Sequence, residues 1–289
     1  MHFAVLASPE SWYLRDLRRA AASRHEITAI TFRQLTASLD GTTARFASGE
    51  LDLKTVDALL VRTMPPGSLE QVVFRMDVLA RLEAAGTRVI NPARAIEAAV
   101  DKYLASAKLQ SAGLTTPRTF VGQTVDDAML GFAQLGGDVV IKPLFGAEGR
   151  GITRLNDEAM AQRAFSLLVN LGAVIYLQEF IPHDGFDLRV LLIGERAFGM
   201  QRRNPLDWRT NVSRGASAEP LELTAELVEA ARQAAAAIGA PVAGVDLLPG
   251  RDGKLYAIEV NAVPGWQAIS RVTGVDIARE VLEFAADSP

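Results

Sequence analysis

The chain has 289 residues, of which 49% are hydrophobic and 22% charged, as in a folded globular protein rather than a disordered one. It contains no cysteine, which excludes disulfides and thiolate chemistry, and its three scattered histidines offer no metal-ligand spacing. A net charge of −4 disfavours broad contact with nucleic acid, and neither a signal peptide nor a long apolar run is present. We therefore expect a cytoplasmic protein that binds neither nucleic acid nor a membrane.

The first ninety or so residues alternate between strand and helix patterns, which indicates a small α/β unit with parallel pairing. At about 150 residues per domain, the length suggests two or three closely packed domains. We place their boundaries at 1–92, 93–184 and 185–289, with α/β architecture overall. The predicted strands of the first unit are 3–7, 27–32, 56–62 and 89–90, and its predicted helices are 12–22 and 68–85.

The second unit begins after Asn91-Pro92 with a helix predicted over 93–112, which Gly113 ends. Lys102 lies in the middle of this helix, where a lysine is usually solvated. Further along, the patterns predict a helix after Thr124, a strand over 138–144, a helix over 158–171 and a strand over 175–181.

A glycine-rich loop follows the strand at 138–144 and contains Gly146, Glu148, Gly149, Arg150 and Gly151. Glycines at this spacing let backbone N–H groups approach a phosphate closely, and Lys142 precedes them. The loop is neither a Walker A motif nor a dinucleotide fingerprint, because the residues and spacing of both are missing. A glycine-rich turn without a ligand remains an equal alternative.

Residues 178–181, Gln178-Glu179-Phe180-Ile181, end an apolar strand and enter a proline. Such an extended segment is compatible with binding the edge of a purine, with Glu179 accepting from its amino group.

The third unit changes to antiparallel strands, predicted at 188–193 and 197–202, followed by an irregular polar stretch at 203–220. Arginine suits a bidentate grip on carboxylate or phosphate. Four arginines with interleaved polar residues therefore suggest anion binding, and the residues are Asp187, Arg189, Arg202, Arg209, Asn211 and Arg214.

After a helix predicted over 225–238, two apolar runs at 244–248 and 256–261 flank an Asp-Gly turn and predict a β-hairpin. If Asp252 and Gly253 form a two-residue turn, Asp246 lies opposite Glu259, and Asn261 points to the same face. Like charges in direct opposition favour a cation between them, and such hard oxygens suit magnesium. The alternative is a solvated edge hairpin. A helix over 276–286 closes the chain.

Together, these segments resemble the ATP-grasp carboxylate-amine ligases, and within them the RimK-like α-L-glutamate ligases, from about Asn91 to Ile269. The resemblance implies an ATP-grasp fold of three lobes, with ATP between the later two. It implies that Asp246, Glu259 and Asn261 bind two magnesium ions, for which manganese is an alternative. The positions that it assigns to ATP are Lys102, Lys142, Gly146, Glu148, Gly149, Arg150, Gly151, Gln178, Glu179, Phe180, Ile181, Asp187 and Arg189.

The resemblance also implies the reaction, in which a carboxylate is activated as an acylphosphate and an amine then forms an amide. Arg202 would neutralise the γ-phosphate, while Arg209 and Asn211 would bind the substrate carboxylate and the developing oxyanion. We expect glutamate as the amine and a small molecule, peptide or protein as acceptor, bound near residues 62–66 and 263–266. The family further implies a homo-oligomer.

Three alternatives stay open from the sequence. They are an ATP-binding regulator without turnover, a ligase for another amino acid, and a ligase that extends a cofactor tail. Trp266 is compatible with a flat acceptor and equally with a packed core position.

Overall fold

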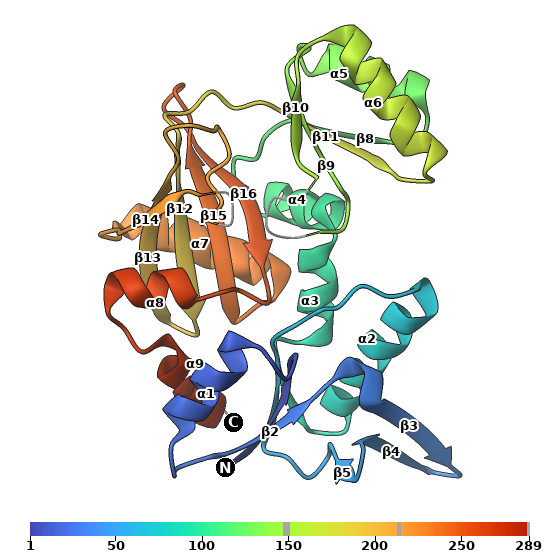
Figure 1. Cartoon of the computed structure of the whole chain (residues 1–289), viewed down its shortest axis with the longest axis vertical. Coiled ribbons are helices and arrows are strands. Elements are labelled where there is room, and N and C mark those ends of the chain that lie inside the picture. Colours follow the sequence, from blue (N-terminus) through green and yellow to red (C-terminus); the bar gives the residue numbers. More distant parts are fainter. Residues whose placement is uncertain (147–150, 213–214, 288–289) are drawn as a thin grey trace.

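The computed structural model describes residues 1–146, 151–212 and 215–287. Three stacked units build the molecule, and both chain ends lie in the unit at the bottom of the view (Figure 1). Within the described ranges, no helix is both long and apolar enough to cross a membrane.

The N-terminal unit is a parallel four-stranded sheet in the order β2-β1-β6-β7, which confirms the predicted parallel pairing. Its strands are β1 (His2–Leu6), β2 (Glu26–Ile30), β6 (Ala58–Val61) and β7 (Arg88–Ile90), and its helices are α1 (Trp12–Ala21) and α2 (Leu69–Ala84). The region between β2 and β6 carried no element prediction. It forms a short 3₁₀ helix (Phe32–Gln34) and a small sheet of β3 (Leu35–Asp40), β4 (Thr43–Ser48) and β5 (Leu51–Asp52).

The single helix predicted over 93–112 is wrong, because the chain forms α3 (Ala93–Val100) and α4 (Lys102–Ser111) with a break between them. Asp101 has extended backbone angles, and its carboxylate accepts hydrogen bonds from the backbone N–H groups of Tyr103 and Leu104. An aspartate in this position caps a new helix. Lys102 is therefore the first residue of α4 and not a mid-helix residue.

A four-stranded antiparallel sheet follows at the top of the molecule, in the order β10-β9-β11-β8. Helices α5 and α6 pack on it through a core that includes Phe132 and Phe165. The elements are β8 (Thr119–Gly122), α5 (Val125–Gln134), β9 (Val139–Lys142), β10 (Thr153–Leu155), α6 (Glu158–Asn170) and β11 (Ile175–Glu179).

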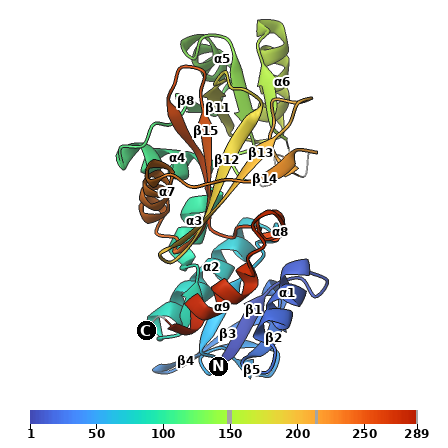
Figure 2. The same ribbon diagram turned by 90° about the vertical axis from the view of Figure 1, so that its left-hand side faces the viewer.

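The five-stranded antiparallel sheet between these units has the order β14-β13-β12-β15-β16. The predicted pairing of 188–193 with 197–202 is confirmed, while β14 forms within the stretch expected to be irregular. The elements are β12 (Phe186–Ile193), β13 (Arg196–Arg203), β14 (Ser217–Pro220), α7 (Ala225–Ile238), β15 (Val242–Pro249), β16 (Leu255–Asn261), α8 (Gln267–Thr273) and α9 (Ile277–Asp287). Helix α9 returns to pack beside α1 of the N-terminal unit (Figure 2).

The predicted hairpin forms, but its turn differs from the prediction. Leu248 pairs with Tyr256 and Pro249 with Leu255, while the backbone N–H of Gly250 donates to Lys254, so three residues connect the strands instead of two. Gly253 supplies the positive φ of +80° that this turn requires. A β-bulge then adds one residue to β16, because Leu247 pairs with Ala257 whereas Asp246 pairs with Glu259. The predicted opposition of the two acids is thus confirmed, although two local differences cancel to produce it.

Asn91 joins the N-terminal unit to this sheet. Its buried amide Nδ2 donates to the carbonyls of Val242, at 2.6 Å, and Ala262, while its Oδ1 accepts from the Val242 N–H at 2.9 Å. Val242 begins β15, and Ala262 directly follows β16. One side chain therefore fixes the relative position of the two hairpin strands at the end opposite the turn.

Because replacement of Asn91 leaves buried backbone groups unpaired, we expect Asn91→Ala to lower the free energy of unfolding by about 3 kcal/mol. Denaturant titration followed by circular dichroism measures it. The exposed Asn170, at the end of α6, is the control, and Asn170→Ala should change the value by less than about 0.5 kcal/mol. Equal small effects in both variants would contradict the role given to Asn91.

Candidate functional site

Asp246 lies at the centre of a buried network of charges, with only 5% of its surface exposed. Arg189 binds both of its carboxylate oxygens, and Arg202 approaches Oδ2 at 3.0 Å. Burial alone would raise the pKa of Asp246, but the two guanidinium groups hold it below its ordinary value. Asp246 is therefore an anion whose charge is already balanced by Arg189 and Arg202.

Asp187 and Arg202 complete this network. They face each other across β12 and β13, and the carboxylate of Asp187 accepts from Arg202 Nε at 2.7 Å and from Thr210 Oγ1 at 2.6 Å. Burial lowers the pKa of Arg202, but Asp246 and Asp187 outweigh it and raise the value. Arg202 is 4% exposed and held between two acids, so in this structure it neutralises protein carboxylates.

Glu259 is in a different position from its neighbour Asp246, because its carboxylate has no hydrogen-bond or ion-pair partner among the described residues. It faces the two lysines that the sequence singled out. Burial lowers the pKa of Lys142 to about 8, while the charges of Glu259 and Asp246 act to raise it and Lys102 lowers it further. Burial also lowers the pKa of Lys102, against the charge of Glu259. These side chains share one electrostatic environment between the two antiparallel sheets.

The ammonium groups of both lysines donate hydrogen bonds to the protein. Lys102 Nζ donates to the Gly146 carbonyl at 2.8 Å, and Lys142 Nζ donates to Gln178 Oε1. Gly151 has φ of +73°, and a Cβ there would lie 2.8 Å from Pro143, so the position requires glycine. The predicted loop residues Glu148, Gly149 and Arg150 lie outside the described residues, as does Arg214.

The segment at 178–181 lines a narrow cavity of about 80 Å³ between the β10-β9-β11-β8 sheet and the hairpin. Leu248 and Ile258 close it from the hairpin side. Ile258 is the extra residue of the β-bulge, so the irregularity that aligns the acids also turns an apolar side chain into this cavity. An apolar slot of this kind, with Lys142 at its edge, suits a flat heterocycle attached to an anionic group.

The carboxylate of Glu179 is already bound by Arg118. Its Oε2 accepts from Arg118 Nε at 2.6 Å, and its Oε1 accepts from the Arg118 backbone N–H at 2.9 Å. The predicted side-chain contact to a purine would have to displace Arg118. No local pattern indicates this partner, because Arg118 and Glu179 are 61 positions apart in the chain.

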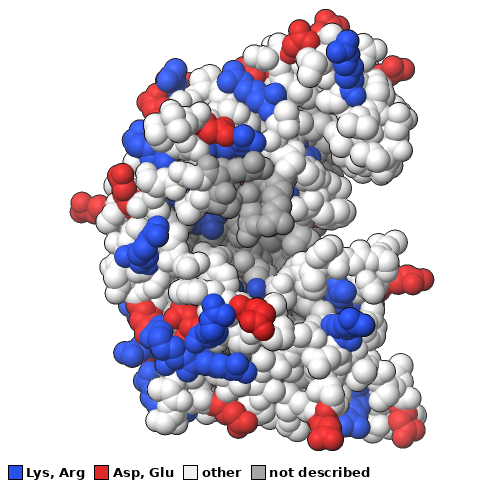
Figure 3. Space-filling model, viewed as in Figure 1, with Lys and Arg blue, Asp and Glu red and all other residues white. Residues whose placement is uncertain are grey.

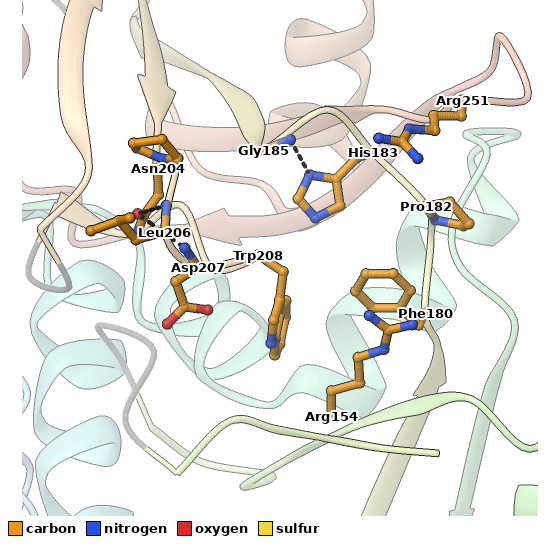
Figure 4. A pocket seen from close by; sticks show the side chains of 11 residues that line it. Arg154, Phe180, Pro182, His183, Gly185, Asn204, Leu206, Asp207, Trp208 and Arg251 are labelled. Atoms are coloured by element: carbon orange, nitrogen blue, oxygen red, sulfur yellow. Dashed lines mark hydrogen bonds between the residues drawn. The ribbon is translucent and has the colours of Figure 1, made fainter.

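A larger cavity of about 470 Å³ adjoins the narrow one and shares Phe180, His183 and Trp208 with it. In Figure 4, the guanidinium of Arg154 lies over the Phe180 ring, 3.5 Å from its centre, and the Phe180 and Trp208 rings meet edge-on with 5.7 Å between their centres. No role was expected from the sequence for Arg154, His183 or Trp208. Trp208 stands in the segment that carries Arg209 and Asn211, which was the available signal.

The structure does not bring Arg209 and Asn211 into contact with the acid pair. The guanidinium of Arg209 binds Asp207 at 2.6 Å and reaches the Ile152 carbonyl at 3.4 Å, so this segment lies against the end of the glycine-rich loop. Asn211 is half-buried. Figure 3 shows a hollow on the right-hand side, between the upper and the lower part of the molecule.

The donor set on the hairpin fits a hard divalent cation such as magnesium. Glu259 has no protein partner among the described residues, and the Asn261 amide donates through Nδ2 to the Gly244 carbonyl at 3.5 Å, which leaves its oxygen as an acceptor. Asp246 fits less simply, because its oxygens contact arginines. It can join such a site only by sharing an oxygen with them.

Comparisons with known proteins identify the family of the chain. Residues 99–285 match the RimK-like ATP-grasp domain. The chain is 33% identical to the tetrahydromethanopterin:alpha-L-glutamate ligase of Methanosarcina acetivorans over 97% of both chains. It is 30% identical to a probable alpha-L-glutamate ligase of Picosynechococcus, covering 98% of this chain and 95% of that one.

Solved structures share the fold. The ATP-grasp ligase PsnB with a minimal precursor has a TM-score of 0.78, at 22% identity over 98% of both chains. PsnB with precursor, Mg and ADP has a TM-score of 0.76, at 21% identity over 98% of this chain and 96% of that one. A RimK domain protein from Sphaerobacter thermophilus has a TM-score of 0.73, at 22% identity over 99% and 100% of the chains. The chain therefore belongs to the RimK-like ATP-grasp family of ATP-dependent carbon–nitrogen ligases.

Proposed function

We propose that this ligase joins the amine of L-glutamate to a carboxylate of a small-molecule acceptor, with ATP converted to ADP and phosphate. The observation that carries the proposal is that Glu259, whose carboxylate has no partner among the described residues, faces Lys102 and Lys142, the second of which lines the apolar cavity at residues 178–181. The choice of glutamate and of a cofactor precursor as acceptor is supported by the names of the relatives.

In the proposed reaction, an oxygen of the acceptor carboxylate attacks the γ-phosphorus of ATP, and ADP leaves with the electrons of the broken P–O bond. The free amine of glutamate then attacks the acyl carbon, loses a proton, and expels inorganic phosphate. The demands on the protein are positive charge around the phosphates, alignment of the reacting groups, and exclusion of water.

The residues fall into groups for these demands. Lys102, Lys142 and the backbone at Gly146 and Gly151 would hold the phosphates, and Gln178 to Ile181 would hold the adenine. Glu259 and Asn261, with a shared oxygen of Asp246, would hold two magnesium ions, which supply further positive charge to the phosphates when bound. Glu148, Gly149 and Arg150, which lie outside the described residues, keep their proposed place in the phosphate loop.

Arg202, Asp187 and Arg189 take a different role from direct ATP contact. Since they bind one another and Asp246, we propose that they orient Asp246 and adjust its charge. Arg209 and Asn211 remain our candidates for binding the substrate carboxylate and the oxyanion. For this, Arg209 would have to release Asp207, to which it is bound in this structure. The boundaries at residues 92 and 184 and the homo-oligomer also remain proposals.

Replacement of the unpartnered acid tests the metal assignment. We expect Glu259→Gln to reduce ADP release by at least about a thousandfold, because the phosphates lose most of their cation support. The unfolding midpoint should be retained, since Glu259 contacts no described residue through its carboxylate. Glu219→Gln, on the exposed strand β14, is the matched control. Unchanged turnover in Glu259→Gln would remove Glu259 from the metal site.

The lowered pKa of Lys142 leads us to expect that nucleotide binding depends on pH. Its pKa of about 8 in the free protein means that it is charged below this pH, and bound phosphates would raise the pKa. Affinity for ADP should therefore fall as the pH rises above 8, by up to about tenfold per unit. Calorimetry between pH 7 and about 9.5 measures it. Lys142→Arg stays charged throughout and should remove the inflection, whereas the same inflection in both proteins would refute the contact.

The same depressed pKa makes a stability prediction with a definite sign. Between about 8 and the ordinary lysine value of 10.5, the unfolded chain binds more protons at this residue than the folded one. The contribution of Lys142 to the free energy of unfolding therefore rises with pH across this window in the nucleotide-free protein.

Substrate identity is tested by measuring ADP release with each of the twenty amino acids crossed with a panel of carboxylate acceptors. Turnover with glutamate supports the proposal, and turnover with a different amino acid replaces glutamate. Silence across the panel, with ATP still bound, would favour the nucleotide-binding regulator that the sequence left open.

A further inference from the structure

Arg62 is a buried guanidinium without an acidic partner among the residues that the structure describes. It directly follows β6, and 9% of its surface is exposed. Its Nη2 donates to the Pro264 carbonyl at 2.6 Å, but its Nε is buried with no hydrogen-bond partner. A buried donor left in this state is unfavourable and points to a ligand that the described residues do not supply.

The electrostatics of Arg62 differ from those of the other buried arginines. Burial lowers the pKa of Arg62 to about 10, and Tyr13 is the group that acts in the opposite direction. Arg202, by contrast, is flanked by Asp187 and Asp246, and Arg189 binds Asp246. An opposite charge stabilises a buried cation, and no acidic side chain among the described residues supplies one to Arg62.

Two aromatic rings hold the guanidinium in place. Arg62 Cζ lies 4.1 Å from the centre of the Trp266 ring and 5.0 Å from that of Tyr13. Trp266 is completely buried, and its Nε1 donates to Asp16 at 2.9 Å. Of the two alternatives for Trp266, the structure therefore shows the packed core position and not a contact surface for a flat acceptor. Stacking on aromatic rings occupies the faces of a guanidinium, and its in-plane N–H groups remain donors, as Nη2 is to the Pro264 carbonyl.

The position of Arg62 in the fold is one where ligands bind. In the order β2-β1-β6-β7, the chain leaves β1 toward β2 on one side and later continues through β6 and β7 on the other. Arg62 stands at the carboxyl end of β6, and its backbone N–H donates to Leu6 at the end of β1. In open parallel sheets, ligands bind outside the carboxyl ends of the strands at this reversal of order.

Arg62 is also tied to the metal-binding hairpin. Pro264, whose carbonyl it binds, lies three residues beyond Asn261 in the sequence. A cavity of about 590 Å³ lies against the same elements, lined by Trp12 and Asp16 of α1, by α8 residues and by Val212, the neighbour of Asn211. The guanidinium therefore links the N-terminal unit to the chain just after the hairpin, and the helices α1 and α8 beside it line a cavity that Val212 also reaches.

We propose that Arg62 binds a substrate carboxylate that does not take part in amide formation. This inference rests on the proposed ligase function and adds a determinant of substrate charge to it. Arginine suits this task because its planar donors match a carboxylate in a bidentate manner. The carboxylate comes either from glutamate, which keeps its acid groups when its amine reacts, or from a second acid group of the acceptor.

The test compares Arg62→Met with Arg75→Met. Arg75 is 8% exposed, donates to the Pro65 carbonyl at 2.8 Å and lies over the Phe32 ring, so it matches Arg62 in burial and contacts. The KM values for glutamate, acceptor and ATP are measured by ADP release. We expect Arg62→Met to raise the KM of one carboxylate substrate by about 10- to 100-fold, with little change for ATP, and Arg75→Met to leave all three unchanged.

The two sources of the carboxylate give different results. If glutamate is bound through its side chain, Arg62→Met also loses the preference for glutamate over glutamine. If the acceptor is bound, its KM rises and this preference is kept. Unchanged KM values in a folded Arg62→Met protein, or equal changes in Arg75→Met, would overturn the proposal.

Two further measurements keep the test decisive. If Arg62→Met does not fold, Arg62→Lys retains a cation but no bidentate grip, and we expect at least a fivefold rise in the same KM, with a wild-type KM overturning the proposal. If no amino acid supports turnover, the proposed function fails separately. Glutarate can then be titrated calorimetrically, and binding that is lost in Arg62→Met supports the role, whereas equal or absent binding in both proteins contradicts it.

Discussion

The structure of the site depends on two carboxylates placed directly opposite each other in a largely buried hairpin. Asp246 and Glu259 repel each other, and the fold resolves this repulsion unequally. Strand β12 supplies Arg189 and β13 supplies Arg202, so Asp246 is neutralised within its own sheet. Glu259 has no such partner among the described residues and faces lysines across the gap between two sheets. The hairpin thus keeps one balanced acid and one available acid side by side.

The rest of the molecule positions groups around this hairpin. Asn91 fixes the ends of β15 and β16 from the N-terminal unit, and the β-bulge at Ile258 turns an apolar residue into the cavity beside the acids. The cap at Asp101 starts a new helix, so that Lys102 reaches the glycine-rich loop. The units are therefore coupled through polar contacts as well as through apolar packing, as expected for a site enclosed between them.

Local signals predicted much of this arrangement. The alternation of strands and helices, the glycine-rich loop after a strand and the Asp-Gly turn are short-range features, and they identified Lys142, Asp246 and Glu259. The same kind of signal was available but not used at Asp101, which caps α4, and at Asp40-Gly41 between β3 and β4. Apolar periodicity alone shows neither the break between α3 and α4 nor the β3–β4 turn, because a capping residue and a turn residue set them.

The remaining features depend on contacts between distant parts of the chain. Strand β16 packs against α3, α4 and α7, and the Ala257 N–H beside the bulge donates to the Thr115 carbonyl, so the bulge goes with contacts to distant segments that the hairpin sequence alone does not predict. The pairing of Arg118 with Glu179 joins residues 61 positions apart, and the stack of Arg62 on Trp266 joins separate units. Sequence patterns identify the residues in such cases, but not which of their charges the protein itself balances.

The central claim is that phosphate passes from ATP to a carboxylate before the amide forms. It is tested by turnover with acceptor labelled with ¹⁸O in its reacting carboxylate. The mechanism predicts that one labelled oxygen appears in the inorganic phosphate, because the bond between this oxygen and the acyl carbon is broken when the amine attacks. Phosphate free of label, formed together with the amide product, would contradict the account.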